Sequence, residues 1–178
     1  MIERKIPLLE EILAPWKEHI GNDYRGYRNH VYRMLHFCLY LANPNEEERR
    51  KLVIAAAFHD IGIWSAGTID YLGPSVEAAL NYLTEHDLEA WGEEVALIIE
   101  MHHKIRRYKD PRFPLVELFR KGDLVDFSLG LVKHGVPIQY IEKVKQAFPN
   151  MGFHKRLMEL AWSRIKSHPL NPAPMMKW

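Results

Sequence analysis

Ionisable side chains stand at four places where the pattern of neighbouring apolar residues predicts a buried position. The places are marked by His30, by His59 with Asp60, by His102 and by Asp123. An isolated charge is costly to bury unless it is paired or bound to a metal. A buried histidine alone is often explained by a bond to a backbone carbonyl, and a helical aspartate by exposure to solvent. The combination is what indicates a functional site.

Together these residues would supply imidazole nitrogens and carboxylate oxygens from four expected helices. Asp126 lies one helical turn beyond Asp123, and two carboxylates on one buried face repel each other unless a cation or a bound proton is present. A mixed imidazole and carboxylate shell with a position left for water is what a hydrolytic divalent metal requires. The sequence therefore predicts such a metal site.

The elements that must position these residues are all expected to be helices, because apolar residues recur at helical spacing nearly throughout. Residues 1–178 show no repeat and no convincing linker, which favours a single all-α domain. The Pro-rich stretch 169–178 is not expected to continue a helix. Helices are expected over residues 9–20 with a break at Pro15, and over about 23–42, 47–60, 75–86, 89–103, 114–128, 137–148 and 153–167.

Composition excludes several classes of protein. Twenty-four Lys and Arg residues against 23 Asp and Glu leave a net charge of +1, which argues against binding to duplex nucleic acid. The longest apolar run, 52–58, is too short to span a membrane, and the first residues lack the pattern of a secretory signal. The lone Cys38 lies in an apolar stretch and reads as a buried thiol. A cytoplasmic location is expected.

Three short segments resemble the motifs of a known family. They are Arg28-Asn-His30-Val31, Ala56-Ala-Phe-His59-Asp60-Ile-Gly62 and Lys121-Gly-Asp123-Leu124. In type and spacing they are similar to the HD-domain superfamily of helical, metal-dependent phosphohydrolases, over residues 27–127. The resemblance implies an HD-type helical bundle in which 137–178 is accessory. It also implies that the metal ligands are His30, His59, Asp60 and Asp123.

Many members of that superfamily carry two further histidines that bind a second metal. His102-His103 stands in the place of the later one, but Gly73-Pro74-Ser75 replaces the earlier one. His86, at the other end of that helix, is expected at the surface. The sequence thus predicts one divalent ion, drawn from Mn, Fe, Co, Ni, Zn and Mg, and disfavours the di-iron oxygenase branch.

Roles for the remaining polar residues follow from the chemistry of phosphate. Asp60 is expected to orient or deprotonate a water, His102 to donate a proton or hydrogen bond, and Lys104 to contribute positive charge in catalysis. Residues expected to bind substrate are Arg28, Arg33, Asp70, His103 and Arg106.

The leading prediction is a hydrolase that cleaves a small phosphate ester, such as a nucleotide. One alternative is a regulatory module that keeps the fold and binds a nucleotide or metal without hydrolysis. Another is a helical interaction protein with a structural metal, which would unfold when the ion is lost. No membrane partner is expected, and a homodimer is left open.

Overall fold

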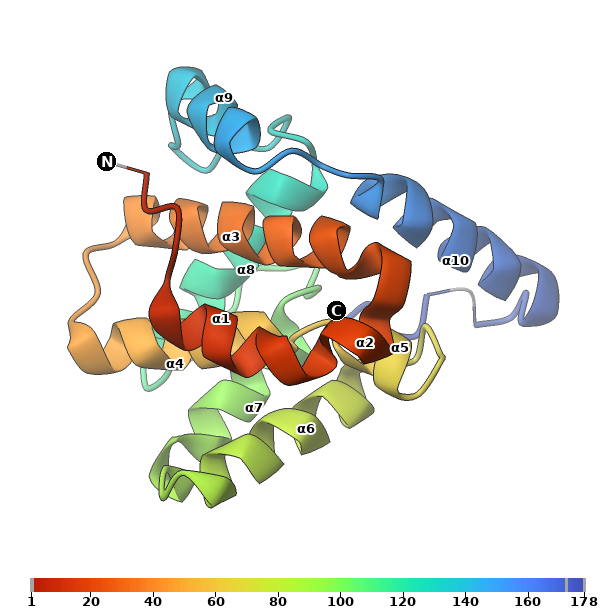
Figure 1. Ribbon diagram of the computed structural model, residues 1–178, viewed down its shortest axis with the longest axis horizontal. Coiled ribbons are helices and arrows are strands. Elements are labelled where there is room, and N and C mark those ends of the chain that lie inside the picture. The colour runs from red at the N-terminus through yellow and green to blue at the C-terminus, as the bar shows by residue number, and fades with distance from the viewer. Residues whose placement is uncertain (1, 172, 178) are drawn as a thin grey trace.

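The computed structural model describes residues 2–171 and 173–177, and its elements there are helical (Figure 1). This confirms the all-α fold class. The helices are α1 (Pro7–Leu13), α2 (Lys17–Ile20), α3 (Tyr24–Leu41), α4 (Glu46–Phe58), α5 (Gly62–Ser65), α6 (Leu72–Glu85), α7 (Gly92–Met101), α8 (Pro114–Phe127), α9 (Ile138–Ala147) and α10 (Phe153–Ser167), with short 3-10 turns at Ala14–Trp16, Gly21–Asp23 and Glu89–Trp91.

Helices α3 and α8 form the centre of the molecule and pack closely along their length. Gly122 allows this approach, because a Cβ at that position would lie 3.0 Å from the backbone nitrogen of Cys38 and from the carbonyl oxygen of Met34. Cys38 is buried, as expected. Since Asp123 follows Gly122 directly, the close approach of the two helices brings Asp123 toward α3.

Helix α4 delivers the His-Asp pair to the same region. It begins with a capping box, in which Asn45 accepts from the backbone of Glu48 and the Glu48 side chain accepts from the backbone of Asn45. Its last residues, 52–58, are all buried. The helix ends at Phe58, so His59 and Asp60 lie at its carboxyl end within the core.

A tight turn after Asp60 is made possible by Gly62. A Cβ there would lie 3.0 Å from Oγ of Ser75 and would collide with the carbonyl oxygen of Tyr71. The Gly62 amide donates to Oγ of Ser75 over 2.9 Å. Ser75, which replaces the expected earlier histidine, thus holds the turn that follows the His-Asp pair.

The helix boundaries mostly agree with the expected ones. The first expected helix breaks near Pro15 into α1, a 3-10 turn and α2. Helix α6 starts three residues earlier than expected, and the short α5 was not anticipated. No helix among the described residues is both long and apolar enough to cross a membrane.

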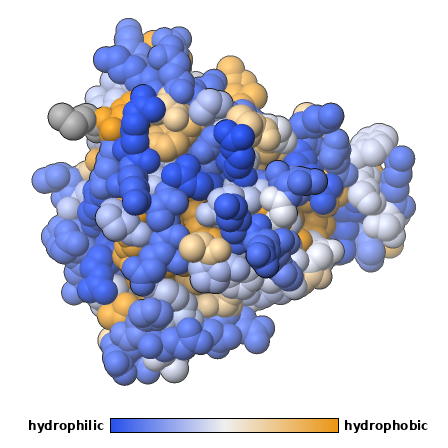
Figure 2. Space-filling model, in the orientation of Figure 1, coloured by the Kyte–Doolittle hydropathy of each residue, from blue (hydrophilic) through white to orange (hydrophobic). Residues whose placement is uncertain are grey.

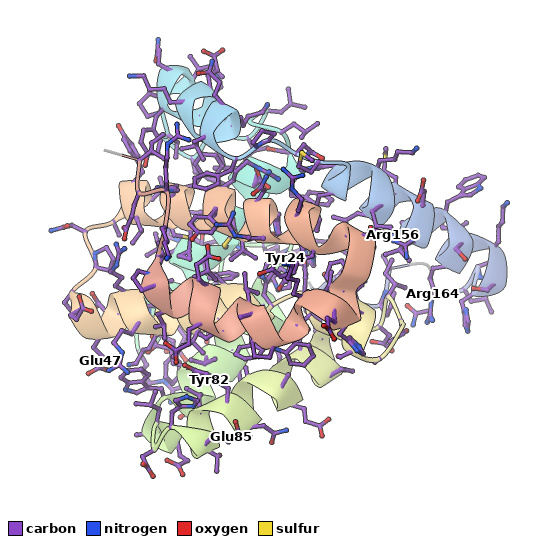
Figure 3. The ribbon with its side chains drawn as sticks, viewed as in Figure 1. Tyr24, Glu47, Tyr82, Glu85, Arg156 and Arg164 are labelled. Carbon is purple, nitrogen blue, oxygen red and sulfur yellow. The ribbon has the colours of Figure 1, made fainter. Side chains whose placement is uncertain are left out.

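Helices α9 and α10 lie beside α3, and α10 extends away from the body (Figure 1). The start of α10 reaches the centre, because Phe153 stacks on the His30 ring with centroids 4.3 Å apart. Arg156 holds the same helix to Asp23, with Nε 3.0 Å from Oδ2. The face of the molecule seen in Figure 2 is largely hydrophilic, and exposed charges such as those of Glu47 and Glu85 point outward in Figure 3.

Candidate metal centre

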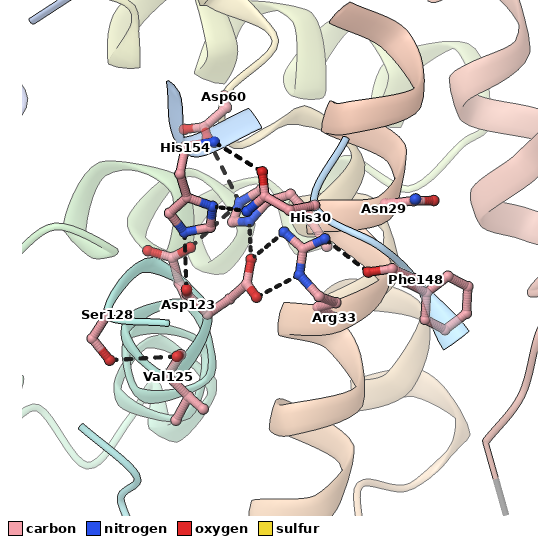
Figure 4. A network of polar contacts seen from close by, with 12 residues as sticks. Asn29, His30, Arg33, Asp60, Asp123, Val125, Ser128, Phe148 and His154 are labelled. Atoms are coloured by element: carbon pink, nitrogen blue, oxygen red, sulfur yellow. Dashed lines mark hydrogen bonds and ion pairs between the residues drawn. The ribbon is translucent and has the colours of Figure 1, made fainter. Parts of the chain in front are cut away.

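Four side chains from distant parts of the sequence meet at one buried point (Figure 4). Nε2 of His30 lies 3.0 Å from Nε2 of His59 and 3.5 Å from Oδ1 of Asp123. Oδ2 of Asp60 lies 3.3 Å from Nε2 of His59 and 3.8 Å from Nε2 of His30. Ligand atoms of His30, His59 and Asp60 lie within 4.8 Å of one another, which is close enough to share one ion, and Asp123 of α8 lies beside them through its contact with His30.

The buried histidines of the cluster all direct Nε2 toward this point. Nδ1 of His30 bonds Oδ2 of Asp126 at 2.7 Å, Nδ1 of His59 bonds the carbonyl oxygen of Ala56 at 2.8 Å, and Nδ1 of His102 bonds that of Ile99 at 2.6 Å. Carbonyl and carboxylate oxygens accept, so each Nδ1 carries the proton and each Nε2 presents a lone pair. Histidines that bind metals are commonly oriented in this way.

Asp126 is the residue whose role the sequence did not reveal. Besides His30, its carboxylate accepts from Nε of Arg33 at 2.6 Å and from Nη2 at 2.8 Å. Burial alone would raise the pKa of Asp126, but the hydrogen bonds from His30 and Arg33 lower it to about 2. The carboxylate is therefore ionised and fixes the orientation of His30. Its helical spacing from Asp123 placed it on this face without indicating its partner.

The charges of the cluster suit a bound cation. Burial lowers the pKa of His30 to about 4, so the ring is neutral at neutral pH and able to act as a ligand. Burial also raises the pKa of Asp123 to about 7, and the nearby charges of Asp60 and Asp126 add to that rise. A metal ion would favour the ionised form of Asp123 and release its proton.

Two polar atoms of the cluster have no hydrogen-bond partner in the described part of the chain. They are Oδ1 of Asp60 and Nε2 of His102, which lie 3.5 Å apart and are buried. Buried polar atoms without partners are rare in proteins and usually mark an ion, a water or a functional role. As ligand atoms, this carboxylate oxygen and this imidazole nitrogen fit a divalent cation of the kind that takes imidazole and carboxylate ligands.

Ligand atoms of Asp60, His102 and His103 form a second group, within 4.8 Å of one another, that shares Asp60 with the first. Nδ1 of His103 lies 4.0 Å from Oδ2 of Asp123. The cluster thus offers more donors than one ion needs, and the number of ions stays a prediction. His86 is exposed and stacks on Tyr82, in agreement with the surface position expected for it.

Tyr71 is a further residue that the sequence did not single out. Its hydroxyl lies 2.8 Å from Nε2 of His103, and the side chain is buried beside the cluster. Burial and the charge of Asp60 hold the pKa of Tyr71 well above its ordinary value, so it remains a phenol. No periodicity marks it, because it precedes α6 in a loop.

Two expected substrate-binding arginines are placed elsewhere. The guanidinium of Arg33 is buried and is occupied by Asp126 and by the carbonyl oxygen of Phe148, 3.0 Å from Nη1. Arg28 pairs with Glu10 of α1 and lies over the ring of Tyr32. Acidic partners already neutralise both guanidinium groups, which argues against the substrate-binding roles expected for them.

The other expected residues lie nearer the surface. His103 and Lys104 are half-buried and follow α7 directly, and Arg106 is exposed shortly after them. Asp70 is exposed in the loop between α5 and α6, and its side chain makes no contact with the cluster among the described interactions. Roles for Lys104, His103, Asp70 and Arg106 stay predictions.

An all-helical protein whose His30, His59-Asp60 pair and Asp123 meet at one buried point agrees with the resemblance noted in the sequence. The chain belongs to the HD domain family, whose sequence pattern matches residues 27–127, more than half of its length. Comparison with curated proteins and with solved structures gives no match.

Proposed function

We propose that this protein is a metal-dependent phosphohydrolase that cleaves a small phosphate ester, such as a nucleotide. The observation that carries the proposal is the meeting of His30, His59, Asp60 and Asp123, with imidazole Nε2 atoms 3.3 to 3.8 Å from carboxylate oxygens. Family membership supports the same activity. The expected cytoplasmic location remains part of the proposal.

A divalent ion in such a site supplies an activated water near neutral pH and polarises a phosphoryl oxygen. The residues of the chain provide the rest of the chemistry. Asp60 has one oxygen beside His59 and a second, Oδ1, with no partner, so it can bind the ion and still orient a water. Its carboxylate can therefore present one oxygen to the ion and the other to the water.

The structure changes the role expected for His102. Its Nδ1 proton is bound by the carbonyl oxygen of Ile99, so the nitrogen that faces Asp60 is an acceptor in the neutral ring. We therefore propose that His102 acts as a ligand or acceptor rather than as a proton donor. Lys104, two residues further along the chain, remains the candidate for positive charge beside the phosphate.

The first experiment measures the metal content of the purified protein and its activity with added Mn, Co, Ni, Mg and Zn. Substrates are p-nitrophenyl phosphate and a set of nucleoside monophosphates. We expect bound metal and release of inorganic phosphate, both lost in Asp60→Asn. The control is Glu85→Gln, which removes an exposed carboxylate on α6. Absence of both metal and turnover would overturn the proposal.

Two other outcomes identify the alternatives. Tight nucleotide binding without release of phosphate would indicate a regulatory module. Loss of the helical circular dichroism signal on chelation would indicate a structural metal. We expect the metal-free protein to stay folded instead, because the apolar core that surrounds α3 does not depend on the ion.

A further inference from the structure

The metal centre is almost closed to solvent, and its least buried side chain is His103. The His103 side chain is 16% exposed, whereas those of Asp60 and Asp123 are 5% and 4% exposed. His103 is therefore the side chain through which the cluster is most open to solvent. What lies on that side decides which substrates can enter.

Residues 173–177 run along this side. Beyond α10 the chain turns back toward α5 (Figure 1). The backbone amide of Ile105 donates to the carbonyl oxygen of Lys177 over 2.8 Å, and Lys104 and Lys177 form an isolated parallel bridge. Since Lys104 directly follows His103, this pairing places the segment beside the open side of the cluster.

Met175 holds the middle of the segment in place. It packs against a small apolar cluster formed by Ile63, Tyr71 and Leu72, which is separate from the main core. Tyr71 in turn bonds Nε2 of His103. The segment thus packs against the cluster that contains the hydrogen-bond partner of His103. Met176, the next residue, is 43% exposed and takes no part in this cluster.

The attachment also brings positive charge to the rim of the site. The bridge pairs the backbones of Lys104 and Lys177, so two lysines lie on adjacent segments next to His103. Their positive charge favours an anionic substrate. The segment therefore contributes both a steric limit and a charge.

We propose that residues 173–177 form a wall of the substrate site that restricts the enzyme to small phosphate esters. The inference rests on the proposed function, and it adds a size limit set by this chain's own segment. The wall is held by a single methionine and a short stretch of backbone pairing, so it can be removed without disturbing α3, α4 or α8.

The test compares three variants with the natural chain. One ends at Asn171, one carries Met175→Asp, and the matched control carries Met176→Asp in the same segment. Circular dichroism confirms that each is folded. The first readout needs no metal and no activity: the rate at which diethyl pyrocarbonate modifies His103, followed by peptide mass spectrometry. We expect faster modification in the shortened and Met175→Asp chains, and an unchanged rate in Met176→Asp.

The second readout is the ratio of kcat/KM for a 5′-phosphorylated tetranucleotide to that for p-nitrophenyl phosphate. We expect this ratio to rise about 10-fold when the wall is removed, since a pocket wall discriminates by differential access and binding in the transition state. Equal reactivity of His103 in the natural and shortened chains, or an unchanged ratio, would overturn the inference. If no variant hydrolyses any ester but His103 becomes more reactive, the wall stands and the proposed function fails.

Discussion

Asp126 links His30 to Arg33, with its two carboxylate oxygens shared between an imidazole Nδ1 at 2.7 Å and a bidentate guanidinium. His154 of α10 also bonds the backbone carbonyl oxygen of Asp126, at 3.0 Å from Nε2. One side chain therefore orients His30, an expected metal ligand, and balances the buried charge of Arg33. Asp126 and Arg33 thus belong to the residues that build the site, and not to those that would contact substrate.

We expect Asp126→Asn to weaken metal binding by about 10- to 100-fold, because such orienting partners contribute this much to affinity. The amide carries no charge, and its NH2 group replaces one of the two oxygens that accept from His30 and Arg33. Titration of the metal-free protein with Mn or Zn measures the effect. Asp87→Asn, at an exposed position, serves as the control and should bind metal normally. Equal affinities in the two variants would contradict the orienting role.

Arg33→Met should destabilise the protein rather than raise the KM for substrate. Removing the guanidinium leaves the buried carboxylate of Asp126 without its cation, and breaking such a pair costs about 3 to 5 kcal/mol. Urea unfolding gives the change in the free energy of unfolding. Arg25→Met, at an exposed position on the same helix, should change it by less than about 0.5 kcal/mol. A folded, fully stable variant with a raised KM would restore the substrate-binding role.

Gly122→Ala tests whether the approach of α8 to α3 positions Asp123. The added Cβ would lie 3.0 Å from backbone atoms of Met34 and Cys38, so the helices must separate. We expect a loss of about 1 to 3 kcal/mol of stability together with weaker metal binding. Gly73→Ala is the matched control, since a Cβ there meets nothing within 4 Å. Unchanged metal affinity in Gly122→Ala would show that Asp123 tolerates the displacement.

Acid stability depends in part on the pairing of Glu10 with Arg28. Burial would raise the pKa of Glu10, but hydrogen bonds from Arg28 and Tyr32 outweigh it and lower the pKa below the ordinary value of 4.5. Because its pKa is lowered on folding, ionised Glu10 stabilises the folded state at pH values above its ordinary pKa. This contribution disappears as the pH falls through the pKa of Glu10 in the folded state. We therefore expect Glu10→Gln to be less stable than the natural chain at pH 7.

The difference between the two proteins should shrink as the pH falls below 4.5, where Glu10 becomes protonated. Urea midpoints measured from pH 7 to pH 3 follow this convergence. Glu18→Gln, an exposed residue of α2, provides the control and should show no such trend. A constant difference across the whole range would mean that the charge of Glu10 contributes nothing.

Periodicity and composition were sufficient for the helical class, most helix positions and the residues of the cluster. His30, His59, Asp60, His102 and Asp123 could be recognised because each is polar at a position where the helical pattern requires an apolar side chain. This mismatch between residue type and helical pattern can be seen in the sequence alone. The roles expected for Arg28 and Arg33 came from phosphate chemistry instead, and the sequence did not show that each pairs with an acidic residue of another helix.

The tertiary structure decided which of these groups touch, which nitrogen of each imidazole faces the cluster, and that Asp126 and Tyr71 belong beside it. It also decided that residues 173–177 pair with Lys104 and Ile105 and pack against the cluster that contains Tyr71. Each of these facts depends on how helices far apart in sequence pack against one another. A local pattern records which face of a helix is buried, but the distance between two side chains on different helices is set by packing alone.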